Sequence, residues 1–277
     1  MSDAYTILTA PTQESEMDWF VQVSELLLNQ TEFMIGGKPH RFLEIEYYLK
    51  NEKHPDPFVH GDPVQQTCGQ WYFHRDEGSY RGGSFKGLDI SFGPEGDFGG
   101  ILIRTIADHE GNIVNGCSLC VDHMLKVTEH ENIASLDGLI AERKIWDESS
   151  PLHLRFSEAL PKSDVLATAR VGLTLKRMYK FKDMPEYIMK PYRFLTEPKI
   201  KKGKLHTIMA LYKAGMDPEE IRTTTSGTRK SIQGYIDSFA EGQSLENFNG
   251  FRGKALKVGD LCRLHGAWNN HFEDGAG

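Results

Sequence analysis

The sequence has few cysteines and no long hydrophobic run. Its 277 residues include four cysteines, which is too few for the disulfide scaffold of a secreted protein. No apolar stretch approaches the roughly 20 residues that cross a bilayer. The acidic N-terminal segment also lacks the basic and then apolar order of a signal peptide. We therefore expect a cytoplasmic protein that has no membrane partner and is a monomer.

Metal-ligand spacing is also scarce. Cys117 and Cys120 stand two residues apart, but no second CxxC and no close histidine pair completes a zinc site. We expect no metal and no cofactor. The formal net charge is −7, which is unusual for a chain that binds nucleic acid over its whole surface.

Hydrophobic periodicity predicts an α+β fold. Residues 14–30 have apolar side chains at helical spacing, and residues 33–106 contain short β-rich runs separated by Gly and Pro. Three more segments, 152–162, 167–175 and 190–195, resemble return strands. We predict a mixed, largely antiparallel, curved sheet with flanking helices in residues 1–198, and a small helical module in residues 199–277.

The C-terminal module has the pattern of a helix-turn-helix. A first helix is expected to end at Ala214-Gly215, and a second begins with Asp217, Pro218 and Glu220, which is a capping-box signature. A turn at Ser226-Gly227 then leads into a third helix. The segment 199–238 contains eight Lys and Arg against four Asp and Glu.

This local positive charge favours contact with double-stranded DNA. The residues expected to contact DNA lie near the start of the third helix, where a recognition helix enters a major groove; they are Thr228, Arg229, Lys230 and Gln233. The alternative is a structural appendage with a solvated basic edge.

The segment 41–50, RFLEIEYYLK, reads as a strand with one apolar and one polar face. The face expected in the core carries Leu43, Ile45, Tyr47 and Leu49. The opposite face carries Glu44, Glu46 and Tyr48, and a short loop with His54 and His60 follows. Carboxylates can orient water or stabilise an oxocarbenium ion, so this face is a candidate half of an active site.

Five motifs in order resemble the alkyladenine (3-methyladenine) DNA glycosylase family. They are LEIEYY (43–48), GLDISFGPEGDFGGILIRTI (87–106), NGCSLCVDHML (115–125), ARVGL (169–173) and KPYRFL (190–195). The resemblance covers roughly residues 15–195. It implies a sheet domain that flips a nucleotide out of the duplex and hydrolyses its N-glycosidic bond. It also implies that Glu46 is the general base, that Tyr48 stacks on the flipped base, and that Arg104 supports the site.

The loop histidine of the family corresponds here to His54 or His60, and the spacing does not decide between them. The hairpin before Asp89 leaves a similar choice, because Ser79 or Tyr80 falls at the family's stacking position depending on a one-residue slip. Arg81 and Lys86 on this hairpin are expected to contact DNA. Lys86 also leaves a lyase step open.

Asp89 stands where the family has Asn. An ionised Asp only accepts hydrogen bonds, which suits an exocyclic amino group such as N4 of cytosine. Together with the small residues of the hairpin and the helical module, Asp89 favours excision of a bulky, hypermodified cytosine of phage DNA, as an antiviral defence that leaves an abasic site. The alternatives are base-excision repair of alkylated purines and a non-enzymatic DNA-binding regulator.

Overall fold

The computed structural model describes residues 6–8 and 15–273, and these form two compact units. Unit 1 comprises residues 1–55, 59–165 and 194–196. Unit 2 comprises residues 56–58, 166–193 and 197–277. Unit 2 therefore begins near residue 166, earlier than the predicted boundary at 198, because the segment before the C-terminal helices packs with those helices.

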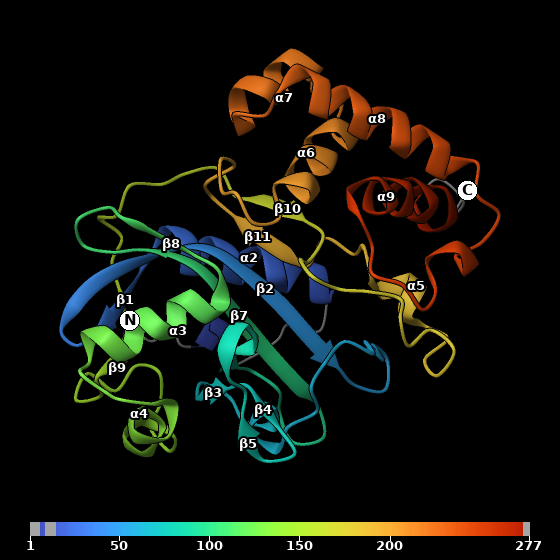
Figure 1. The fold of residues 1–277 in the computed structure, drawn as a ribbon. Coiled ribbons are helices and arrows are strands. Elements are labelled where there is room, and N and C mark those ends of the chain that lie inside the picture. The colour runs from blue at the N-terminus through green and yellow to red at the C-terminus, as the bar shows by residue number, and fades with distance from the viewer. Residues whose placement is uncertain (1–5, 9–14, 274–277) are drawn as a thin grey trace. The chain divides into compact units, whose positions relative to one another are not determined.

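Unit 1 is built on a largely antiparallel sheet (Figure 1). Its central path runs β11-β2-β7-β6-β3, while β1 pairs with β2 and β9, and β8 pairs with β7. The strands are β1 (Thr31–Ile35), β2 (Lys38–Lys50), β3 (Trp71–Phe73), β6 (Leu88–Ser91), β7 (Phe98–Ala107), β8 (Ile113–Asn115), β9 (Leu152–Phe156) and β11 (Arg193–Leu195). The predicted α+β class with a largely antiparallel sheet is confirmed.

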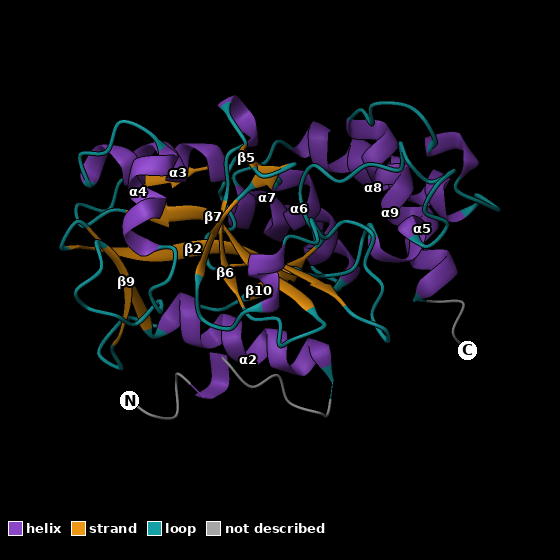
Figure 2. Ribbon diagram, turned by 90° about the horizontal axis from the view of Figure 1, so that it is seen from below, coloured by secondary structure: helices purple, strands orange, loops and turns teal. Residues whose placement is uncertain are grey.

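Helices lie on both faces of this sheet (Figure 2). Helix α2 (Glu16–Asn29) covers the apolar face, where Phe20 stacks on Tyr47 with ring centroids 4.2 Å apart. Helix α3 (Cys117–Val127) packs against β7 on the other side and is followed by α4 (Ile133–Ile140). The core therefore fills the α2 side, and the opposite side is free to carry polar groups.

The register of β2 and β7 is interrupted beside Glu44. Phe42 pairs with Ile106, Glu44 with Thr105 and Ile45 with Ile103. Leu43 and Arg104 have no opposite residue in this pairing, so each strand contains an irregularity of the bulge type.

The expectation that Leu43 belongs to the core face is wrong. The side chain of Leu43 remains partly exposed, while Phe42 is fully buried. The backbone carbonyl of Leu43 instead accepts a hydrogen bond from the Thr196 amide at 3.1 Å. A bulge shifts the alternation of side chains by one residue.

A short hairpin connects β3 to β6. Strands β4 (Arg75–Asp76) and β5 (Ser79–Tyr80) pair across the two-residue turn Glu77-Gly78. Both turn residues have positive φ, 49° and 83°, as tight hairpin turns require. Two 3₁₀ turns, η1 (Pro63–Gln66) and η2 (Gly83–Phe85), flank the hairpin in the sequence.

Unit 2 contains the predicted three-helix pattern. Its elements are β10 (Leu166–Thr168), α5 (Met184–Tyr187), α6 (Lys204–Lys213), α7 (Pro218–Thr225), α8 (Arg229–Gln243), η3 (Asn249–Phe251) and α9 (Val258–Phe272). Asp217 and Glu220 form the expected capping box, and Gly215 has a φ of 84° after α6. The predicted strand at 167–175 is mostly wrong, since only Leu166–Thr168 is extended in a sheet.

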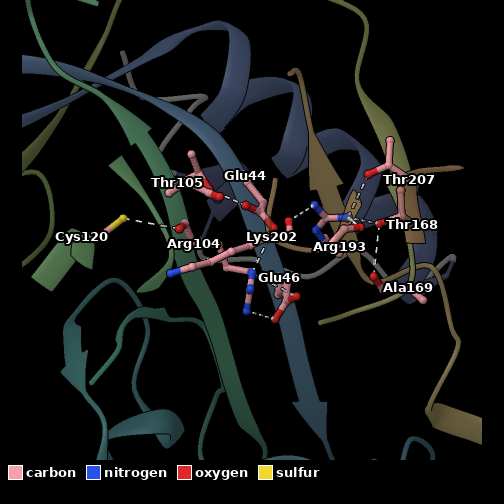
Figure 3. A network of polar contacts seen from close by, with 12 residues as sticks. Glu44, Glu46, Arg104, Thr105, Cys120, Thr168, Ala169, Arg193, Lys202 and Thr207 are labelled. Atoms are coloured by element: carbon pink, nitrogen blue, oxygen red, sulfur yellow. Dashed lines mark hydrogen bonds and ion pairs between the residues drawn. The ribbon is translucent and has the colours of Figure 1, made fainter. Parts of the chain in front are cut away.

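Two buried arrangements hold unit 2 together. Arg193, which has no exposed surface, donates to the hydroxyls of Thr168 and Thr207 at 2.9 and 3.3 Å (Figure 3). Helices α8 and α9 also approach closely: a Cβ added at Gly266 would lie 2.0 Å from the Phe239 carbonyl oxygen. The C-terminal segment, to which the sequence assigned no role, is thus part of the core of unit 2.

Gly266→Ala is therefore expected to lower the free energy of unfolding by about 1–3 kcal/mol, because the methyl group forces α8 and α9 apart. Gly234→Ala on α8 is the matched control. No atom lies within 4 Å of its added Cβ, so it should stabilise the helix by about 0.5–1 kcal/mol. Urea denaturation followed by circular dichroism measures both, and equal effects of the two variants would contradict the close approach.

Candidate active site

The polar side of the sheet contains a buried arginine between two carboxylates (Figure 3). Glu44 and Glu46 have no exposed surface and Arg104 is 7% exposed. Arg104 Nε donates to Glu44 Oε1 at 3.0 Å, and its Nη1 donates to Glu46 Oε2 at 3.3 Å. The bulge on β7 supplies this arginine, because it releases residue 104 from the regular pairing with β2.

Burial lowers the pKa of Arg104, but Glu46 and Glu44 more than offset this effect, and the pKa lies above its ordinary value. The guanidinium therefore carries a permanent positive charge at every pH at which the protein is folded.

The two carboxylates have different surroundings. Glu44 Oε2 accepts a short hydrogen bond from the Thr105 hydroxyl, which in turn accepts from Asn115 Nδ2 at 2.8 Å. Glu46 Oε2 accepts from the Tyr48 hydroxyl at 2.9 Å. Glu44 is thus bound to groups of the sheet, whereas Glu46 is linked to Tyr48, a half-buried residue of the same polar face.

Asp89 shares a row with Glu46. In the sheet register, Glu46 on β2 is opposite Leu102 on β7, and Leu102 is opposite Asp89 on β6. Directly opposite residues project to the same side of a sheet, so both carboxylates lie on the α3 side. In the next row, Tyr48 is opposite Gly100.

Asp89 is paired with a histidine that the sequence did not single out. His74 Nε2 lies 2.7 Å from Asp89 Oδ1, and the two side chains are 11% and 2% exposed. The ring of His60 meets that of His74 edge to face, with centroids 4.4 Å apart. The Tyr72 hydroxyl lies 3.4 Å from His60 Nδ1. Desolvation and the neighbouring His74 lower the pKa of His60, whose side chain is still exposed.

These contacts separate the two loop histidines. His60 adjoins the Asp89–His74 pair, whereas His54 is 5% exposed and its backbone is tied to Asn51. Of the two positions that the sequence left open, His60 is the one that the structure brings to Asp89.

The hairpin residues are engaged in contacts of their own. The Tyr80 hydroxyl donates to Asp137 Oδ2 on α4 at 2.6 Å, and Arg75 stacks on the Tyr80 ring 5.0 Å from its centroid. Arg81 Nε donates to the Arg75 carbonyl at 3.2 Å. Lys86 forms an ion pair with Asp122 on α3. Ser79 is exposed on β5. None of these residues is linked to Glu46 by a hydrogen bond or ion pair within the described part of the chain.

The two cysteines of the CxxC motif lie at the start of α3. Cys120 Sγ is 3.5 Å from the Arg104 carbonyl (Figure 3), and burial raises its pKa. Burial also raises the pKa of Cys117, on which Arg104, Glu46 and Asp89 act electrostatically. In residues 6–8 and 15–273, no group of three or more His, Cys, Asp or Glu could hold a metal ion. No helix in these ranges is long and apolar enough to cross a membrane.

The predicted DNA-contacting residues lie at the first turns of α8. Thr228 is its N-cap and accepts from the Ser231 amide. Arg229 donates to Glu219 on α7 at 3.0 Å, although its side chain is 83% exposed. Lys230 is exposed, and Gln233 donates to Asp237 at 2.8 Å. A groove of about 230 Å³ at this place is lined by Asp217, Pro218, Glu219, Arg229, Ile232 and Gln233.

Sequence reasoning missed four residues around the two carboxylates: His74, Tyr72, Thr105 and Gly100. The signal for Tyr72 and His74 was their two-residue spacing in WYFH, which puts both on one face of a strand. Thr105 gave no such signal, because its contact with Glu44 depends on the bulge.

The fold and the site define an α+β protein with a buried, arginine-neutralised carboxylate pair on the open face of its sheet. No protein-family model matches the chain. It is similar to a protein of Acanthamoeba polyphaga mimivirus, uncharacterized protein L759, with 31% identity over 203 residues, covering 68% of this chain and 90% of the viral protein. The chain belongs to the same family as the mimivirus protein.

Arg104→Ala is expected to lower the free energy of unfolding by about 3–5 kcal/mol, because it leaves two carboxylates buried without a cation. The loss should shrink as the pH falls toward 4, where protonation removes the repulsion between Glu44 and Glu46. Arg143→Ala, which removes an exposed pair with Asp147, is the control and should cost under about 1 kcal/mol. Urea titrations at several pH values measure both, and a pH-independent loss for Arg104→Ala would contradict the charge argument.

Proposed function

We propose that the protein is a monofunctional DNA glycosylase that flips out a modified base and hydrolyses its N-glycosidic bond. The observation that carries the proposal is the buried Glu46 carboxylate, held by Arg104 and Tyr48 in one row with Asp89. The resemblance of the strand motif to the alkyladenine glycosylases supports the same conclusion.

In this mechanism Glu46 accepts a proton from the water that attacks C1′ of the sugar. Its negative charge also stabilises the oxocarbenium character of the transition state. The fixed charge of Arg104 holds Glu46 ionised and oriented, and the Tyr48 hydroxyl fixes the second contact. Glu44 is a positioning residue, because its oxygens bind Arg104 and Thr105.

Asp89 favours a cytosine derivative over an alkylated purine. Its carboxylate can accept a hydrogen bond from the exocyclic amino group of cytosine. Beside it, Gly100 has no side chain at the position opposite Tyr48, which leaves room next to the proposed stacking residue. A bulky hypermodified cytosine of phage DNA is the substrate that we favour, with a role in antiviral defence. Repair of alkylated purines is the competing substrate class.

Double-stranded DNA as the partner is supported by the basic segment of unit 2. Lys230 is exposed at the start of α8, the place of base contact in a helix-turn-helix. Arg222 and Arg229 lie nearby, but Glu219 binds both of them. A positive potential for DNA therefore comes from fewer free cations than the sequence counts.

Glu46→Gln should lower abasic-site formation by about 10²–10⁴-fold, because an amide cannot take the proton from water. The assay uses duplexes that contain unmodified cytosine, hydroxymethylcytosine, glucosylated hydroxymethylcytosine or a methylated purine. Glu52→Gln, an exposed residue after β2, is the matched control and should keep full activity. Activity on the methylated purine alone would favour repair. DNA binding without abasic sites on any duplex would favour the regulator.

Lys230→Ala should weaken DNA binding and reduce the slope of log K against log salt concentration by about 1. Glu219→Gln should act in the opposite direction, because it releases Arg222 and Arg229. Fluorescence anisotropy over a salt series measures both variants. If neither variant changes the slope, α8 does not contact DNA phosphates.

A further inference from the structure

The two carboxylates of the polar row have partners of different chemistry. Glu46 is balanced by Arg104, whose charge is permanent. Asp89 is balanced by His74, at 2.7 Å, and an imidazole gains or loses its proton near neutral pH. The first arrangement keeps a base ionised, whereas the second shares a proton that can be given away. Titratable groups whose environments differ in this way divide the roles of base and acid between them.

The geometry orients Asp89 for such a transfer. Its Oδ1 binds His74 Nε2, while Oδ2 lies over the backbone of β7, where a Cβ added at Gly100 would be only 2.6 Å away. Gly100 is the residue opposite Tyr48, the proposed stacking residue. One oxygen of Asp89 thus faces the imidazole, and the other lies beside the place assigned to the base.

The leaving group decides whether an acid is needed. A base alkylated on a ring nitrogen carries a positive charge and leaves as a neutral molecule once the C1′–N bond breaks. An uncharged base leaves as an anion unless it receives a proton in the transition state. We propose, resting on the glycosylase function above, that the Asp89–His74 pair protonates the leaving base and that the substrate is an uncharged modified base.

The step balances as follows in atoms and electrons. The C1′–N bond breaks and its electron pair stays on the base nitrogen, while the proton shared by Asp89 and His74 passes to the base. The water oxygen forms the new bond to C1′, and its proton passes to Glu46. Exchange with solvent then removes the proton from Glu46 and returns one to the Asp89–His74 pair.

His60 provides the route for that return. Its exposed ring contacts the His74 ring, and the Tyr72 hydroxyl lies beside it. Other groups that act electrostatically on His60, Tyr72 or Cys117, and that surround the pair, are Arg81, Asp62, Cys117 and Glu46. Removing a proton from the pair at high pH should therefore stop the reaction on an uncharged base.

The test compares single-turnover excision of an uncharged modified cytosine and of cationic 7-methylguanine from DNA across pH 5–10. In the wild-type protein, the rate on the uncharged base should fall at alkaline pH and the rate on 7-methylguanine should not. His74→Gln and Asp89→Asn should each lower the rate on the uncharged base by about 10²-fold or more and remove its alkaline decline. His109→Gln, an exposed histidine, is the control and should change nothing.

The possible outcomes separate the two proposals. An alkaline decline that survives in both variants, or Glu46-dependent activity restricted to 7-methylguanine, overturns the acid role while the glycosylase function stands. An absence of Glu46-dependent abasic sites on every duplex overturns the glycosylase function itself. If His74→Gln fails to fold by circular dichroism, Asp89→Asn and the wild-type profiles on the two substrates still decide the question.

Discussion

The polar side of unit 1 depends on one buried guanidinium. Without Arg104, two carboxylates would be buried side by side with no counter-charge, an arrangement whose cost exceeds that of most single contacts in a protein. The bulge beside Glu44, the hydrogen bond of Thr105 and the position of α3 over β7 all surround this charge. The local disruption of the sheet is thus compensated by the ion pairs that it allows.

The same charge fixes how the site can work. A base that must be ionised is best placed beside a permanent cation, and an acid is best placed beside a group that titrates. Glu46 and Asp89 meet these two conditions from opposite sides of one strand, separated by Leu102. Two acids on the same sheet face can therefore take different roles, and their roles follow from Arg104 and His74 more than from the acids themselves.

Local patterns in the sequence were sufficient for most of the fold. Alternation identified β2, β6 and β7, and capping signals identified α7 to within a residue, because both depend on neighbours in the chain. The bulge that moves Leu43 out of the core, the Glu44–Arg104 pair and the close packing at Gly266 depend on partners far along the chain. For the same reason the site prediction included Glu46 and Asp89 but lacked His74, whose meaning appears only when β3 and β6 are paired.

Charge in unit 2 illustrates the same difference between a count and an arrangement. The segment 199–238 has a surplus of cations in the sequence, yet Glu219 alone binds Arg222 and Arg229. Exposed ion pairs of this kind contribute little to stability, so their effect is mainly on the electrostatic potential around α8. A protein that binds DNA through backbone phosphates gains affinity from each unpaired cation. A carboxylate that occupies two of them at the start of the candidate recognition helix lowers non-specific affinity. This would leave the choice of target more dependent on the chemistry at Glu46 and Asp89.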